Sequence, residues 1–306
     1  MTLERSLTEL SDEDKPFETT GLLQLSGLTS DELIEFKTAW PELSPQRKCA
    51  VLTRLGELCE DNLELDFSAV FRSCLTDGDD SVREQATKGL WECDDRVIIR
   101  PLIKLLSGDP SPAVRAAAAT SLGRFAAMAQ EGKLLARDAD RVQDALLAAI
   151  ESDEDMEVGQ RAIEVVAYFR SNGVEQIISD AYTSGDPSLK RSAIYAMGRT
   201  SDIRWLPTVL ADMDDEDSAV RFEAANACGQ LGDESTVPHI INLIKDEDVQ
   251  VQVSAVQALG TTGGGLAKRA LLMCVEQEDE PVAEAARAAL ENLEFGDDPK
   301  GLRFQA

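Results

Sequence analysis

Histidine is almost absent from this sequence, which has a single one, His239, in 306 residues. The chain also lacks a CxxC pair and any distinctive serine or cysteine nucleophile motif. Without a nucleophile–base pair or a group of metal ligands, the residues give no support to catalysis or metal binding. We therefore predict no catalytic residue, no metal site and no cofactor. The six cysteines are expected to fill the core, and they are Cys49, Cys59, Cys74, Cys93, Cys228 and Cys274.

Positive charge and long apolar runs are scarce as well. The chain has 30 Lys and Arg against 57 Asp and Glu, for a net charge of -27. Such a chain repels phosphate, so we predict no nucleic-acid partner. No apolar run reaches membrane-spanning length and no leader precedes the first helix, so we predict no membrane contact and a cytoplasmic location. The acidic charge fits either solubility in a salty cytoplasm or a basic partner.

A repeat is what the sequence does contain. An apolar residue that precedes a basic one in the clearest copies recurs in steps of 32, 44, 31, 31, 31 and 31 residues. These register residues are Val82, Val114, Val158, Leu189, Val220, Val251 and Val282. A constant period of this size is typical of stacked repeats. The sequence therefore predicts an all-α fold, a right-handed α-solenoid of about eight two-helix repeats.

The repeats give the expected boundaries. We predict a flexible acidic tail and short cap at 1–28, a solenoid at 29–295 and a C-terminal tail at 296–306. Within the solenoid, 29–60 is a degenerate first repeat that opens on a capping box at Thr29. Residues 130–137 form an insertion, either neutral or a local binding element. The glycines at 263–265 are the one flexible link.

Each repeat reads as two helices joined by an acidic turn. Positions 0, +4, +7, +8 and +11 from the register residue share one face of the second helix and should be core. Alanine at +4 and glycine at +9 would let neighbouring helices approach closely. Aspartates three residues before the register residue should cap the second helix. The basic residue at +1, as in Arg83 and Arg221, should pair with an aspartate of a neighbouring turn.

Three segments of the sequence carry a family resemblance, and they read DDSVREQATKGL, SPAVRAAAATSLG and DSAVRFEAANACGQLG. They resemble the HEAT-like repeats named for the phycobilisome (PBS) lyases, over about residues 66 to 295. Relatives with such repeats include bilin lyase subunits, an iron-dependent deoxyhypusine hydroxylase and many binding scaffolds. The hydroxylase's metal site is built from several His-Glu pairs, whereas His239 is followed by Ile240. An oxidoreductase function is therefore not expected.

The predicted partner-binding surface is the concave face lined by the second helices. Positions +2, +3, +6 and +10 should point into it, and repeats four to six supply the arginines and aromatics that dominate protein interfaces. The candidate residues are Arg161, Tyr168, Arg191, Tyr195, Arg199, Phe222, Asn226 and Gln230. The alternative interpretation of this surface is an ordinary solvated face.

Three functions stay open at this point. The first is a non-enzymatic scaffold that holds a protein or peptide, with the chain itself monomeric. The second is a bilin lyase-like factor, in which the arginines hold propionates and the tyrosines flank a chromophore. The third is a structural subunit of a larger assembly.

Overall fold

The computed structural model describes residues 2–12, 16–62, 64–276 and 279–297. Every regular element in these residues is a helix, so the predicted all-α class is confirmed. The chain forms two compact units, Met1–Val166 and Ala167–Ala306. They are called the first unit and the second unit.

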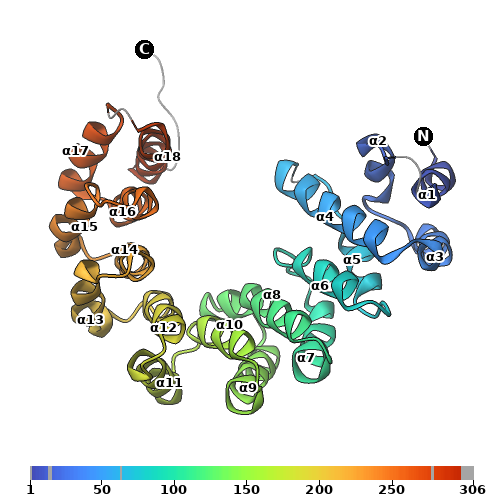
Figure 1. Ribbon diagram of the computed structural model, residues 1–306, viewed down its shortest axis with the longest axis horizontal. Coiled ribbons are helices and arrows are strands. Elements are labelled where there is room, and N and C mark those ends of the chain that lie inside the picture. Colours follow the sequence, from blue (N-terminus) through green and yellow to red (C-terminus); the bar gives the residue numbers. More distant parts are fainter. Residues whose placement is uncertain (1, 13–15, 63, 277–278, 298–306) are drawn as a thin grey trace. The chain divides into compact units, whose positions relative to one another are not determined.

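The predicted two-helix repeats are all present as helix pairs (Figure 1). In the first unit the pairs are α3 (Ser30–Ala39) with α4 (Pro45–Asp61), α5 (Ser68–Cys74) with α6 (Asp80–Lys88), α7 (Ile99–Gly108) with α8 (Pro112–Gln130), and α9 (Ala136–Ser152) with α10 (Met156–Val166). In the second unit they are α11 (Asn172–Thr183) with α12 (Pro187–Arg199), α13 (Leu206–Ala211) with α14 (Ser218–Leu231), α15 (Val237–Leu243) with α16 (Val249–Thr262), and α17 (Gly264–Cys274) with α18 (Glu280–Asp297).

Within each unit the first helices form one layer and the second helices the other (Figure 1). Short 3-10 turns precede α7, α13 and α15, at Arg96–Ile98, Ile203–Trp205 and Glu234–Thr236. Four of the five predicted core positions are buried in α14, where Val220, Ala224, Ala227 and Cys228 are at most 3% exposed. The fifth, Leu231 at +11, is only partly buried because it is the last residue of the helix. The insertion is seen as a lengthened α8 followed by a short loop before α9.

The N-terminal residues differ from the predicted flexible tail. Leu3–Ser11 form helix α1, and Leu3, Leu7 and Leu10 on one face of it are buried. Its C-terminal carbonyls, from residues 9, 10 and 12, accept hydrogen bonds from Arg47 of α4. The prediction of a tail is wrong here because the leucines at positions 3, 7 and 10 form an apolar stripe along one face of this helix, and that face is buried. Two shorter elements follow, α2 (Thr19–Leu22) and a 3-10 turn at Leu23–Leu25.

Other terminal predictions have mixed outcomes. The Thr29 capping box is confirmed, since the Thr29 and Glu32 side chains each bond to the other's backbone N–H. Helix α18 extends to Asp297, so the predicted C-terminal tail is helical at its start. The rest of that tail, 298–306, lies outside the described residues.

The aspartates of the turns cap the second helices as predicted. Asp79 accepts hydrogen bonds from the N–H groups of Ser81 and Val82 at the start of α6. The equivalent aspartates of later repeats do the same, and they are Asp155, Asp186, Asp217, Asp248 and Asp279. Each cap satisfies N–H groups that the helix leaves unbonded, and its charge faces the positive end of the helix dipole.

A ladder of ion pairs joins successive repeats, which confirms the predicted role of the +1 cation. Arg83 donates two parallel hydrogen bonds of 2.8 Å to Asp109 in the next turn. The same bond pattern recurs in Arg115 with Asp153 and in Arg221 with Asp246. Lysines form the other rungs, Lys48 with Asp77 and Lys190 with Asp212 and Asp215. The turn acids are therefore structural.

The fourth repeat departs from this pattern. Its +1 residue is Gly159, and the fifth repeat has Ser184 where other turns have the accepting aspartate. Neither side chain can form an ion pair. The division between the two compact units falls just after α10, the second helix of the fourth repeat, at Val166.

The ladder predicts a loss of stability in acid. Hydrogen bonds from Arg115, Arg221 and Lys190 hold the pKa values of Asp153, Asp246 and Asp215 below the usual aspartate range. A carboxyl whose pKa is lower in the folded than in the unfolded chain stabilises the fold fully above the unfolded pKa, about 3.9. That contribution is lost as the pH falls through the lower, folded values.

We therefore expect the urea midpoint of the protein to fall steeply below about pH 4. Unfolding followed by circular dichroism at a series of pH values measures it. Removing a rung, as in Arg221→Ala, should flatten the fall. An unchanged midpoint between about pH 5 and pH 3 in the wild-type protein would contradict the proposed linkage.

Candidate functional site

The second helices of the second unit carry most of the predicted binding residues. Tyr168 lies just beyond the end of α10, and the others lie on α12 and α14. All of them are half-buried except Gln230, which is exposed. These side chains are Tyr168, Arg191, Tyr195, Arg199, Phe222, Asn226 and Gln230. None is enclosed in the core, so each remains accessible to a ligand.

Three of them form an arginine–tyrosine stack. The guanidinium carbon of Arg199 lies 4.8 Å from the ring centroid of Tyr195 and 5.7 Å from that of Tyr168. The planar cation therefore lies against two aromatic faces, an attractive arrangement that holds all three side chains in place. Burial raises the pKa of the Tyr168 phenol, with the neighbouring Arg199 charge acting in the opposite direction. The phenol is thus a neutral hydrogen-bonding group at ordinary pH.

Arg191 lies apart from this stack, at the other end of α12. Its guanidinium donates a 3.0 Å hydrogen bond to the Ser188 hydroxyl and lies 3.6 Å from Asp217, the cap of α14. The sequence pattern puts Arg191 and Arg199 on one binding face, which stays a prediction. However, Arg191 is held by the acidic turn before α14, whereas Arg199 is held by the two tyrosines.

Two predicted binding residues of α14, Phe222 and Asn226, are tied by hydrogen bonds to the next second helix, α16. Asn226 accepts a 3.0 Å hydrogen bond from the buried Ser254 of α16 through its side-chain oxygen, and Ser254 also bonds to the Phe222 carbonyl. A serine in the next helix thus fixes Asn226. Its amide nitrogen remains available as a donor.

Arg161 belongs to the first unit, on α10, where it pairs with Glu164 at 2.8 Å. It lines a groove of about 530 Å³ on the second helices of that unit. The groove's floor is made of small side chains of α8, and Glu84 and Lys88 of α6 line it too. The floor residues are Ala113, Ala116, Ala117, Thr120 and Ser121.

Trp91 is a lining residue of this groove that sequence reasoning missed. Its side chain follows α6 and is 52% exposed, the largest exposed aromatic among the described residues. The position of Trp91 within its repeat could have indicated that its side chain is exposed. Trp91 stands at +9, where Gly123, Gly198 and Gly229 stand in other repeats. A bulky residue at a position that elsewhere allows close packing must point away from that contact.

The residues with reactive side chains lie in different environments. His239 is exposed at the start of α15. All six cysteines are free, and the core position predicted for them holds for Cys74, Cys228 and Cys274, which are buried. The other three, Cys49, Cys59 and Cys93, are only partly buried. Burial raises the pKa of the Cys228 thiol to about 12, which keeps it unreactive. The described residues contain no group of three or more His, Cys, Asp or Glu placed to hold a metal ion.

Comparison with known families matches HEAT repeats to residues 68–142 and 206–291, more than half of the chain. The chain belongs to the HEAT-repeat family. The match covers repeats in both units and agrees with the helix pairs described above. The narrower resemblance to phycobilisome lyase repeats stays a prediction. A search of curated proteins gave no match.

Solved structures with a similar fold include yeast importin-beta, Kap95p, with 13% identity and a TM-score of 0.53. That alignment covers 98% of this chain and 47% of importin-beta, so the HEAT-repeat chain spans about half of it. The CpcE–CpcF phycocyanin lyase of Nostoc sp. PCC7120 aligns over 74% of this chain and 94% of that one, with 16% identity and a TM-score of 0.49. Human deoxyhypusine hydroxylase aligns over 96% of both chains, with 16% identity and a TM-score of 0.38. At these identities the likeness is one of fold.

Among the described helices of this HEAT-repeat chain, none has the length and apolar character needed to cross a membrane.

Proposed function

We propose that this HEAT-repeat chain is a non-enzymatic scaffold that binds a protein or peptide along its second helices. The observation that carries the proposal is the stack of Arg199 on Tyr168 and Tyr195, half-buried at the surface of the second unit. Arginine and tyrosine are the residues most often found to dominate binding energy at interfaces. Because the stack already holds these side chains, a partner would lose little side-chain entropy on binding.

The ladder and caps account for much of the acid on the turns, and the second helices carry a different surface. In the second unit this surface offers a stacked guanidinium, two phenols and the amides of Asn226 and Gln230. These groups both donate and accept hydrogen bonds, which suits the backbone of an extended peptide. In the first unit the groove is lined by the exposed indole of Trp91, by small side chains of α8 and by charged residues that include Glu60 and Glu157.

The test is affinity capture from native lysate with mass spectrometry, using the full chain as bait. We expect the wild-type chain to retain a specific partner, and the double variant Arg191→Glu/Arg199→Glu to lose it. The conservative variant Arg199→Lys keeps the charge but loses the planar stack, so it should weaken capture by an intermediate amount.

The matched control reverses two other charges, Lys37→Glu and Lys245→Glu, at exposed positions outside the second helices. It has the same net charge as the double variant, so equal loss in both would assign the effect to general repulsion. Retention of the partner by the Arg191→Glu/Arg199→Glu chain would refute the proposed surface. Thermal melts of all variants check that the fold is intact.

The same stack favours the second candidate, a chromophore-handling factor of the bilin lyase kind. In that role Arg199 would hold a propionate, and Tyr168 and Tyr195 would flank the tetrapyrrole. Co-expression with a bilin source decides between the two. A coloured protein whose colour is lost in Arg199→Glu would favour the chromophore, and a colourless one the scaffold.

A further inference from the structure

The first unit contains a region of positive charge in an otherwise acidic chain. Residues 96–141 have eight Lys and Arg against four Asp and Glu, while the whole chain has a net charge of -27. The cations are Arg96, Arg100, Lys104, Arg115, Arg124, Lys133, Arg137 and Arg141. Only Arg115 belongs to the ion-pair ladder, so structural pairing of the repeats does not account for this excess.

A buried carboxylate gathers several of these cations on the first-helix layer. Asp138 of α9 is 8% exposed, and three guanidiniums lie near it. The distances to its oxygens are 3.5 Å for Arg137, 3.5 Å for Arg141 and 3.9 Å for Arg96. One negative charge thus faces three positive ones. The surplus stays at the surface, since the three arginine side chains are between 42% and 71% exposed.

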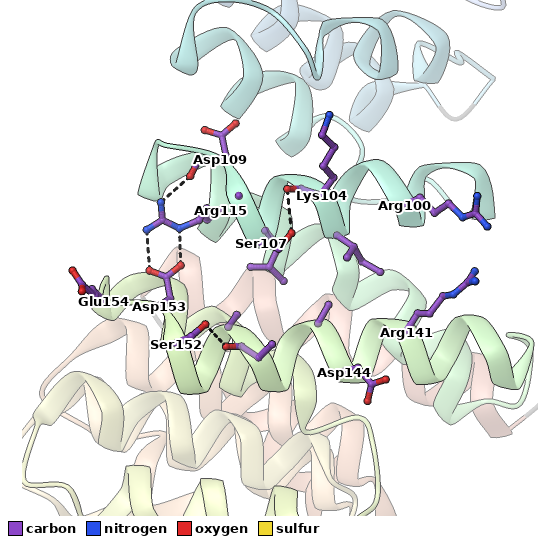
Figure 2. Close-up of a pocket in the computed structure, with 16 residues that line it drawn as sticks. Arg100, Lys104, Ser107, Asp109, Arg115, Arg141, Asp144, Ser152, Asp153 and Glu154 are labelled. Atoms are coloured by element: carbon purple, nitrogen blue, oxygen red, sulfur yellow. Dashed lines mark hydrogen bonds and ion pairs between the residues drawn. The ribbon is translucent and has the colours of Figure 1, made fainter.

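Two further cations continue this surface along α7. Arg100 and Lys104 are exposed, one helical turn apart, and neither has an ion pair within the described part of the chain. With Arg141 they line a cleft of about 1020 Å³ between α7 and α9. Figure 2 shows Arg100 and Arg141 pointing toward the same end of this cleft.

The two ends of the cleft carry different side chains. Its floor contains the apolar side chains of Ile103 and Ala145, and the carboxylate of Asp144 on α9 also lines it (Figure 2). At the end opposite Arg100 and Arg141, Arg115 holds Asp153 by hydrogen bonds of 2.6 and 2.8 Å (Figure 2). Glu154 lies beside that pair (Figure 2). A ligand with negative charge at one end and aliphatic groups beside it would match this order.

We propose that the cleft between α7 and α9 binds an acidic, amphipathic peptide segment of a partner protein, with its carboxylates on Arg100 and Arg141. Guanidiniums bind carboxylates through paired hydrogen bonds, and the apolar floor takes aliphatic side chains. The site lies on the first-helix layer, so it is separate from the surface of the proposed function. The scaffold would then have two binding faces.

The acidic charge of the whole protein does not prevent this contact. At physiological ionic strength charges farther than about 8 Å are largely screened, so the nearby cations dominate at the cleft. Attraction at short range also predicts that binding weakens as salt is added.

The test uses the full chain and a fluorescein-labelled peptide with glutamates on one helical face and leucines on the other. Fluorescence anisotropy should show saturable binding that weakens with added salt. The variant Arg100→Glu/Lys104→Glu should weaken binding by at least on the order of tenfold. Because neither side chain forms an ion pair with a described residue, this variant should melt at nearly the wild-type temperature.

Three comparisons complete the experiment. The charge-matched control Lys37→Glu/Arg72→Glu, at exposed positions of α3 and α5, should bind as the wild type does. A peptide with glutamine in place of glutamate should not bind. Equal binding of the glutamine peptide, equal loss in the control, or binding only to a phosphoserine version of the peptide would overturn the proposal.

Discussion

Replacing Arg83 with alanine should destabilise the protein by about 3–5 kcal/mol. Arg83 holds Asp109 through two hydrogen bonds of 2.8 Å, and the side chains are only 11% and 4% exposed. A third donor of the guanidinium bonds to the Asp77 carbonyl. The variant leaves a buried carboxylate whose remaining donor is the N–H of Ser111. Such an uncompensated buried charge is costly because it has lost water without gaining a partner.

The matched control is Arg54→Ala. Arg54 also pairs with a carboxylate, Glu57, at 2.6 Å, but these side chains are 37% and 53% exposed. An exposed pair contributes at most about 1 kcal/mol, since water replaces the partner. Urea unfolding of the two variants gives both losses in the same units. Similar losses would show that burial of the ladder has no energetic consequence, contrary to our argument.

The pH dependence separates a lost ion pair from lost packing. In the Arg83→Ala chain Asp109 should take up a proton more readily, which removes its buried charge. The variant's deficit relative to wild type should therefore shrink as the pH is lowered toward about 4. A deficit that is constant with pH would assign the loss to the missing side-chain contacts instead.

Much of the fold could be predicted because the same interaction recurs at equivalent positions of several repeats. The caps at Asp79 and Asp217 and the pairing of Arg221 all followed from positions counted from the register residue. An interaction between equivalent positions of adjacent repeats needs no knowledge of the tertiary structure, since stacking brings those positions together.

Interactions that occur once were missed. Helix α1 docks through Arg47, which bonds to carbonyls at the end of α1 and lies 4.7 Å from the Phe17 ring centroid. No repeat shares this contact. The stack of Arg199 on Tyr195 and the turning of Arg191 toward Asp217 both depend on rotamers that the sequence does not specify. The cleft between α7 and α9 has no counterpart signal in the repeat, because Arg100 and Arg141 come from first helices of two different repeats.

The glycines at +9 offer a test of the close packing that the repeat predicts. A Cβ on Gly229 would lie 2.9 Å from the Cα of Ala258 in α16, nearer than such atoms approach. Gly198 and Gly260 face Ala227 and Ala289 in the same way. Because the obstacle is backbone, α14 and α16 would have to move apart for Gly229→Ala. Overpacking of this kind costs about 1–3 kcal/mol.

The same substitution at Gly56 should have the opposite sign. Gly56 lies inside α4, and nothing lies within 4 Å of the position its Cβ would take. Alanine there gains helix propensity without a clash, so Gly56→Ala should stabilise by about 0.5–1 kcal/mol. Chemical unfolding of both variants measures the two signs. If Gly229→Ala were also stabilising, the helices would be farther apart than in this structure. The close contact of α14 with α16 would then have to be abandoned as the reason for glycine at this position.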